Sequence, residues 1–345
     1  MMKVTRKDFL FAGAIASLAP SVRAANAQGF AARTGALGKY VGDLPPGRYD
    51  SHTHVYPGDP DPAKIDASFK AAGLAGGVVF SRCPNGWQVP GAKVLPPAEA
   101  IDNVIAWCDG LPAVYPFYWI DPAAPNACDI VDMAVEKGIY GFKVIRGNGL
   151  PVDATTLPVY RKIAAAGKPL TFHTGILWDG RDSSDSFRPA NWEGLLEVPH
   201  LRFCLAHVSW PWCDECIAVY GKMLNAIVRR GFDVPEMFID VTPGTPKIYR
   251  RDALTKLFTV GYDVADHVMF GTDCRVNRYN VGWSTDWQRT DDAIYSEVGL
   301  DAVAIDGIYR TALRRYLFGG DNKSRKVPTP DGRNGNPLEG KGRKA

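Results

Sequence analysis

Residues 50–56 read DSHTHVY, and this stretch begins the pattern that decides the fold. Side chains alternate between the two faces of a β-strand, so His52 and His54 point the same way if this stretch is a strand. The chain of 345 residues has only six histidines. Two of them therefore face one side of one short strand, and the meaning of the pair depends on the rest of the pattern.

Eight short apolar or β-branched runs, the first of which contains the histidine pair, alternate with helix-like stretches. The runs lie at 49–55, 76–81, 112–119, 139–145, 169–173, 201–207, 236–241 and 267–273. The clearest helical stretches lie at 66–75, 127–138, 157–167 and 216–231. Eight strands that are each followed by a helix predict an α/β fold, a single-domain (β/α)8 TIM barrel over 48–318. An open doubly wound sheet is the alternative, but no G-x-G-x-x-G motif opens a helix here.

Three further residues that can bind metal or move protons end later strands. His173 ends the fifth run, His207 the sixth, and Asp273 the eighth. Active sites of such barrels are built at the carboxyl ends of the strands. Of the other two histidines, His200 lies seven residues before His207 and His267 six before Asp273. At ~3.3 Å per residue, each lies roughly 20 Å away, near the opposite face.

Neutral imidazoles together with one carboxylate are the ligands that a zinc-like divalent ion prefers. Such an ion lowers the pKa of a bound water to near 7 and makes a nucleophile available. A lone histidine in a strand is usually a hydrogen-bonded structural residue. Four histidines and one aspartate at strand ends favour a site for one divalent ion, with Zn²⁺ ahead of Mn²⁺ or Fe²⁺.

The ordered motifs D-x-H-x-H (50–54), H-T-G (173–175), A-H (206–207) and G-T-D (271–273) resemble the amidohydrolase superfamily. The resemblance is to the amidohydrolase-related group (family 2) that includes aminocarboxymuconate-semialdehyde decarboxylase-like enzymes. It implies that His52, His54 and His173 bind one metal, with Asp273 as a further ligand or as a base. It also implies that His207 polarises the substrate or carries a proton.

Lys143, in the fourth run, leaves the metal count open. In two-metal members of the superfamily a lysine on this strand is carboxylated and bridges the ions, which would make His207 a ligand of the second ion. The flanking motifs favour the one-metal version, and an ordinary alternative is a lysine that pairs with a carboxylate inside the barrel.

The substrate is predicted only as a class. Arg82, Arg146 and Arg275 follow strands two, four and eight and could grip a carboxylate, and Trp178 follows strand five. These residues indicate a small, partly apolar or cyclic substrate that carries a carboxylate. Hydrolysis of an ester, lactone or amide is the preferred reaction. Non-oxidative decarboxylation of an aromatic or unsaturated acid, and a barrel that binds metal or ligand without turnover, are the alternatives.

The two ends of the chain differ from its middle in charge. Residues 1–24 hold four basic residues and one acidic residue, and 319–345 hold seven and three, so the middle carries a net charge of −4. This balance argues against a nucleic-acid partner. We expect residues 1–27 to be an export signal, twin-arginine-like or of the general secretory kind, with an uncleaved amphipathic anchor as the alternative.

The predicted organisation of the rest of the chain follows from this interpretation of the ends. Residues 28–47 are expected to be a linker and 319–345 a basic, disordered tail. The mature protein is expected to be periplasmic or extracellular, without a membrane span. A homodimer is left open.

Overall fold

The structure is a computed structural model that describes residues 42–85, 91–145, 149–264 and 266–320, together with the backbone at 327–328 and 334–335. The expected export signal, most of the expected linker and Arg146 lie outside the described residues. Among the helices within the described ranges, none combines the length and the apolar character needed to cross a bilayer.

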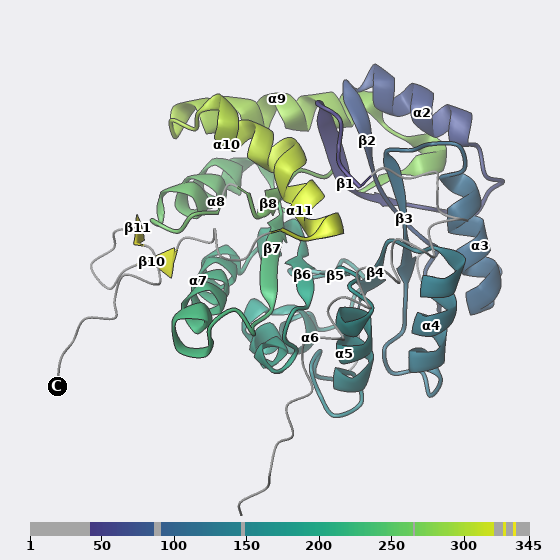
Figure 1. The fold of residues 1–345 in the computed structure, drawn as a ribbon. Helices are drawn as coiled ribbons and strands as arrows, with labels where there is room; N and C mark the ends of the chain where they lie inside the picture. The colour runs from purple at the N-terminus through teal and green to yellow at the C-terminus, as the bar shows by residue number, and fades with distance from the viewer. Residues whose placement is uncertain are drawn as a thin grey trace, which may run out of the picture. The chain divides into compact units, whose positions relative to one another are not determined.

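The strands form one parallel sheet that curls into a barrel, with helices between successive strands (Figure 1). The order of the strands in the sheet, β8-β7-β6-β5-β4-β3-β2-β1-β9, follows the chain, as the predicted α/β barrel requires. The strands are β1 (Arg48–His54), β2 (Leu74–Phe80), β3 (Val114–Trp119), β4 (Gly141–Val144), β5 (Leu170–Phe172), β6 (Arg202–Leu205), β7 (Glu236–Asp240), β8 (Val268–Met269) and β9 (Cys274–Arg275).

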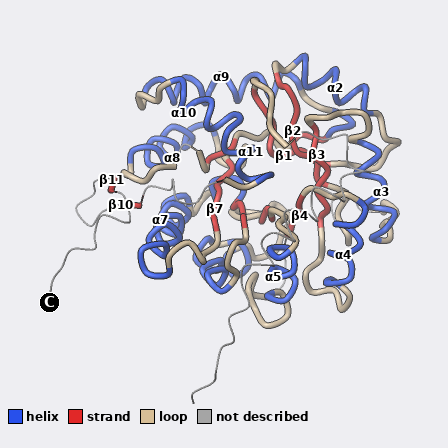
Figure 2. Tube along the Cα trace, in the orientation of Figure 1, coloured by secondary structure: helices blue, strands red, loops and turns tan. Residues whose placement is uncertain are grey.

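Except for the last helix, the helices cover the outer face of the sheet, and Figure 2 shows them outside the strands. The apolar side chains of the helices pack against those of the strands in one large core. The helices are α2 (Pro62–Ala71), α3 (Pro97–Trp107), α4 (Ala127–Lys137), α5 (Leu157–Ala165), α6 (Ser184–Phe187), α7 (Cys213–Arg230), α8 (Lys247–Thr259), α9 (Val281–Glu297), α10 (Ala302–Asp306) and α11 (Ala312–Phe318). The 3-10 or π-helical stretches within the described residues are η2 (Pro189–Glu197), η3 (Ala206–Ser209), η4 (Val276–Arg278) and η5 (Gly307–Thr311).

The eighth strand is interrupted, and the interruption closes the barrel onto β1. The backbone N–H of Ser51 donates to the carbonyl of Phe270 at 2.9 Å, and the N–H of Asp273 donates to the carbonyl of His52 at 2.8 Å. Beyond this turn, β9 pairs with the end of β1. The turn between β8 and β9 therefore sets Asp273 directly against the histidine pair.

The inside of the barrel opposite this end is filled partly by the last helix. Leu313, Tyr316 and Leu317 of α11 are buried among side chains from the strands. The hydroxyl of Tyr316 lies 2.8 Å from Thr171 Oγ1 in β5. Figure 1 shows α11 lying across the strands. Among the described residues, α11 thus fills the end of the barrel interior that lies opposite the histidine pair.

Three boundaries differ from the sequence-based expectation. The stretch 66–75 was expected to be helical, but α2 ends at Ala71 and β2 begins at Leu74, because Gly73 turns the chain with a φ of +72°. The end of the expected linker belongs to the barrel, since Leu44 is 1% exposed within its core. In the expected disordered tail, Val327–Pro328 and Asn334–Gly335 pair as β10 and β11.

Candidate metal centre

The two histidines of β1 bring their ring nitrogens together at the carboxyl end of the strand. His52 Nε2 and His54 Nε2 lie 3.1 Å apart, and both side chains are buried. The ring of Phe80 in β2 packs edge-on against His52, with centroids 4.9 Å apart. The alternation of side chains along β1 therefore aims two imidazoles at one point, as predicted.

Asp240, at the end of β7, fixes the orientation of His52. Its Oδ2 accepts a hydrogen bond from His52 Nδ1 at 2.8 Å, which leaves Nε2 as the ring nitrogen with a free lone pair. Its Oδ1 accepts from the backbone N–H of His207 at 2.8 Å and from that of Thr242 at 3.1 Å. The buried carboxylate of Asp240 thus fixes the position of His52 relative to that of His207.

Asp273 completes a group of three donor atoms. Its Oδ1 lies 3.3 Å from His54 Nε2 and 3.7 Å from His52 Nε2. The residue has a φ of +58°, a conformation that aspartate tolerates better than most residues. Asp50 holds this turn in place, because its Oδ2 accepts from Thr272 Oγ1 at 2.6 Å. Burial raises the pKa of Asp50 to about 7.

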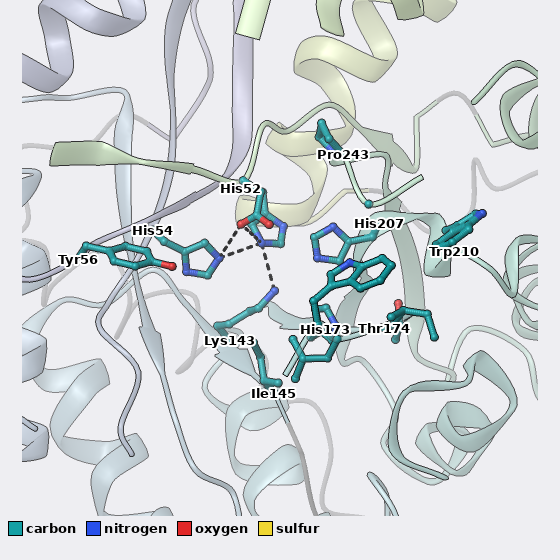
Figure 3. Close-up of a pocket in the computed structure, with 15 residues that line it drawn as sticks. His52, His54, Tyr56, Lys143, Ile145, His173, Thr174, His207, Trp210 and Pro243 are labelled. Atoms are coloured by element: carbon teal, nitrogen blue, oxygen red, sulfur yellow. Dashed lines mark hydrogen bonds and ion pairs between the residues drawn. The ribbon is translucent and has the colours of Figure 1, made fainter. Parts of the chain in front are cut away.

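His173 and His207 stand on the other side of the same space. The centroids of their rings are 5.0 Å apart, and His207 lies 5.1 Å from His52 by the same measure. Figure 3 shows the four histidines and Lys143 facing this space. His173 Nε2 and His207 Nδ1 are buried and have no hydrogen-bond partner among the residues that the structure describes. Polar atoms buried in this way normally have partners, so these two point to a ligand.

The backbone at His207 is strained. His207, Val208 and Ser209 have φ angles of +64°, +42° and +56°, in a region that residues with a Cβ seldom occupy. Thr174 Oγ1, 2.8 Å from Ser209 Oγ, and the carboxylate of Asp240 hold this corner in place. Strain of this kind collects at functional sites, where the surrounding structure maintains it.

Lys143 occupies the floor of the space. Its side chain is fully buried, and Nζ lies 3.3 Å from His52 Nε2 and 4.9 Å from the centroid of the Phe80 ring. Burial lowers the pKa of this amine to about 8. The structure therefore places a positive charge beside the three donor atoms.

Burial also sets the protonation of the histidines. It lowers the pKa of His52 to about 3, with help from the charge of Lys143, and lowers those of His54, His173 and His207. At neutral pH all four rings are uncharged, which is the form that can bind a metal ion.

Burial acts in the opposite direction on Asp273. It raises the pKa of this carboxyl, but the hydrogen bond with His54 and the positive charges that the histidines carry only at low pH outweigh it and hold the pKa well below its usual range. The group therefore combines neutral imidazoles with an ionised carboxylate.

The donor atoms fit a small divalent ion. Ligands about 2.0–2.1 Å from a tetrahedral zinc lie roughly 3.3 Å from one another. The three distances among His52 Nε2, His54 Nε2 and Asp273 Oδ1 are 3.1, 3.3 and 3.7 Å. Among the described residues, these three form the group whose ligand atoms all lie within 4.8 Å of one another. His173, which was expected as a ligand, is outside that group and shares its cavity.

A cavity of about 160 Å³ opens above these residues. Its lining residues can be compared with the predicted substrate-binding residues. All four histidines, Lys143, Asp273 and Trp178 line it. Arg82 and Arg275 are not among the described residues that line it. Arg82 Nη2 donates to the carbonyl of Lys93 at 2.6 Å, and the Arg275 guanidinium lies 4.0 Å from the centroid of the Tyr56 ring.

The two remaining histidines lie away from the cavity, as expected. The side chain of His200 is 56% exposed and pairs with Asp233. His267 is buried between Asp266 and Glu236.

Asp240 and Asp50 are the functional residues that sequence reasoning missed. Asp240 lies one residue before the end of the seventh run, close to the strand end as His207 and Asp273 are in theirs, and that position was the available signal. Asp50 is part of the D-x-H-x-H motif, but its role needs Thr272, which is 222 residues away in the chain.

No protein-family model and no curated protein matches the chain. Among solved structures, dihydroorotase from Campylobacter jejuni is similar over 78% of this chain and 83% of its own, with 14% identity and a TM-score of 0.47. Adenine deaminase from Arthrobacter aurescens is similar over 75% and 73%, with 14% identity and a TM-score of 0.46. N-acetylneuraminate lyase from Fusobacterium nucleatum is similar over 75% and 79%, with 12% identity and a TM-score of 0.42. With TM-scores below 0.5, these likenesses carry no argument about family or reaction.

Proposed function

We propose that this protein is a metal-dependent hydrolase that cleaves an ester, lactone or amide bond in a small cyclic or carboxylate-bearing substrate. The observation that carries the proposal is the convergence of two neutral imidazole nitrogens and one carboxylate oxygen at distances of 3.1, 3.3 and 3.7 Å. In this proposal His52, His54 and Asp273 hold one divalent ion, Zn²⁺ first, and His173 is a further donor.

The bound ion would supply Lewis acidity and a water of lowered pKa. Asp273 would accept a proton from the attacking water, because it is ionised and lies beside the histidine pair. That proton would then pass to the oxygen or nitrogen that leaves the substrate. The reaction adds the elements of water across the cleaved bond, so the proton balance closes without another reactant.

His207 and Lys143 face the substrate from two other sides. The ring of His207 is neutral and is fixed by Asp240 through its backbone, so it can donate a hydrogen bond to the substrate carbonyl. Lys143 offers a charge to the substrate carboxylate or to the oxygen on which negative charge develops.

The same amine favours one second candidate, the non-oxidative decarboxylation of a carboxylate-bearing substrate. A buried cation beside a cavity can hold the carboxylate that leaves as CO₂. Hydrolysis releases an acid from an ester or lactone, whereas decarboxylation releases CO₂ and consumes a proton.

The test begins with the metal content per chain, measured by elemental mass spectrometry after purification without chelator. About one ion per chain supports the proposal, a value near two gives Lys143 a bridging role, and no uptake on reconstitution overturns it. The loaded protein is then screened against aryl esters, lactones, anilides and aromatic acids with a pH indicator and a CO₂ assay. For a substrate that is found, the proposed role of His207 predicts that His207→Asn lowers kcat about a hundredfold.

A further inference from the structure

An aromatic stack adjoins the cavity, and the reaction proposed above does not use it. The rings of Trp178 and Trp210 are near parallel, 19° apart with centroids 6.4 Å apart. Trp210 in turn stacks on Tyr249, at 28° and 6.1 Å. Both tryptophans line the cavity. The loops after β5 and β6 and the first turn of α8 thus each contribute one ring to the aromatic stack (Trp178, Trp210 and Tyr249).

The backbone of Trp210, the middle residue of the aromatic stack, is held firmly. The carbonyl of Trp210 accepts a hydrogen bond from the N–H of Ile176 at 2.9 Å. Gly175 permits this approach, because a Cβ at that position would lie 2.5 Å from the same oxygen. Gly244 likewise lets the loop after β7 pack against His207, since its Cβ would lie 2.9 Å from that of His207. The loop after β5 is therefore fixed to Trp210, and the loop after β7 is fixed to His207, at the wall of the cavity.

The outer rings are open to solvent. Trp178 is 79% exposed and Tyr249 is 53% exposed, although both are large apolar side chains. The neighbouring Ile248 is 83% exposed. A group of exposed apolar side chains beside a polar cavity is the usual signature of a binding surface.

The size of the cavity says which part of a substrate would meet the aromatic stack. Its volume of about 160 Å³ is close to that of a cavity that holds one benzene-sized ring. A metal ion and a water, at about 30 Å³ of liquid volume for the water, take part of this space. The space that remains suits the reacting group, so the larger part of a substrate would extend past Trp178.

The chemistry of the walls favours a flat apolar group there. Beyond the histidines, Lys143 and Asp273, the polar side chains among the described lining residues are those of Tyr56, Thr174 and the tryptophans. A sugar needs several hydrogen-bond partners, whereas an aromatic ring needs only faces to stack on. We propose that Trp178, Trp210 and Tyr249 form a stacking subsite for an aromatic ring of the substrate, distal to the bond that is cleaved. The proposal rests on the proposed function for the position of that bond.

The test compares two ligands that share a carboxylate and a chain length, 4-phenylbutyrate and 4-cyclohexylbutyrate, by calorimetry on the metal-loaded protein. We expect the phenyl compound to bind more tightly. Trp178→Ala should weaken its binding about tenfold and leave the cyclohexyl compound within twofold. Trp178→Phe should keep most of the affinity, because it keeps a ring. Val303→Ala, at an 80% exposed position on α10, is the matched surface control.

Equal binding of the two compounds, or equal losses for both in Trp178→Ala, would overturn the subsite. Binding of phenyl β-glucoside no tighter than that of methyl β-glucoside, with both lost in Trp178→Ala, would overturn it in favour of a sugar site. The binding measurements test the subsite independently of the proposed hydrolysis. If the binding pattern appears but no ester, lactone or anilide is cleaved, the proposed hydrolase fails while the subsite stands.

Discussion

Asp240 Oδ2 accepts a hydrogen bond from His52 Nδ1 at 2.8 Å, with both side chains almost fully buried. The contact joins the ends of β1 and β7, which are 188 residues apart in the chain. It determines which nitrogen of His52 carries the proton, and hence which nitrogen faces His54. The proposed metal site therefore depends on a carboxylate that does not face the ion.

Asp240→Asn should lower the affinity for Zn²⁺ or Co²⁺ about 10- to 100-fold, because the amide is a weaker acceptor and leaves the His52 tautomer free to change. The measurement is a competition titration with a chelating dye, supported by the Co²⁺ absorption spectrum. Asp266→Asn is the matched control, since Asp266 Oδ1 makes the same kind of contact with His267 Nδ1, at 2.7 Å, away from the cavity. Equal metal affinity in the Asp240 variant and the wild type would show that the contact is structural.

The fold could be predicted from the sequence because each strand is a short buried run, and each such run can be recognised from its own local sequence. The sequence also predicted that His52, His54, His173, His207 and Asp273 share one end of the barrel, since that follows from their places at strand ends. Contacts between side chains of strands that are distant in the chain could not be predicted in this way. Asp240 meeting His52, and Asp50 meeting Thr272, depend on how the curled sheet brings the ends of β7 and β8 to β1.

The substrate residues were the weakest part of the prediction. A place after a strand says that a side chain is near the rim, but not which way it turns. Trp178 lines the cavity, whereas Arg275 turns to the ring of Tyr56 and Arg82 to a backbone carbonyl. Arg146 lies outside the described residues, so its expected role stays a prediction.

The ligand set makes a graded prediction. His54→Asn should reduce the bound metal to below a tenth of an ion per chain, because it removes the donor nearest to both His52 and Asp273. His173→Asn should weaken metal binding and leave a measurable fraction, because the three donors that converge, His52, His54 and Asp273, all remain. Elemental mass spectrometry after dialysis gives both values. His200→Asn, at a half-exposed position, should match the wild type. An equal loss in the His173 and His54 variants would make His173 a full ligand.

Lys168, just before β5, gives a prediction about pH that is independent of the metal centre. It is 7% exposed, and burial together with the charge of Arg202 lowers its pKa to about 8. The amine of an unfolded chain has a pKa of about 10.4, so between these values the unfolded chain binds more protons than the folded one. The free energy of unfolding therefore rises with pH across this window, by about 2 kcal/mol between pH 7 and pH 9.5.

Lys168→Met should remove this contribution, which urea denaturation at pH 7 and pH 9.5 can measure. The wild type should gain about 2 kcal/mol more than the variant on going to the higher pH. Lys143 is present in both proteins, so its own titration cancels in the comparison. A smaller gain in the wild type than in the variant would mean that the folded protein does not disfavour the charged amine.

Breaking the buried ion pair between Arg250 of α8 and Asp291 of α9 should lower the free energy of unfolding far more than breaking the exposed pair between Arg251 and Glu297. The side chains of Arg250 and Asp291 are both fully buried, and two hydrogen bonds of 2.8 and 2.6 Å join them. Asp291→Asn leaves a buried guanidinium without its counter-charge, so we expect a loss of about 3–5 kcal/mol in the free energy of unfolding. Glu297→Gln breaks the pair with Arg251, which is largely exposed, and should cost less than about 1 kcal/mol.

The double variant Arg250→Met with Asp291→Leu separates the charge from the packing. It removes both charges, so it should recover most of the stability that Asp291→Asn loses. Urea denaturation of the three variants at pH 7 makes the comparison. If the double variant is no more stable than Asp291→Asn, the loss comes from the shape of the contact between α8 and α9 and not from an unpaired charge. The contact between α8 and α9 would then be stabilised mainly by packing around Trp287, whose ring centroid lies 5.0 Å from the Arg250 guanidinium carbon.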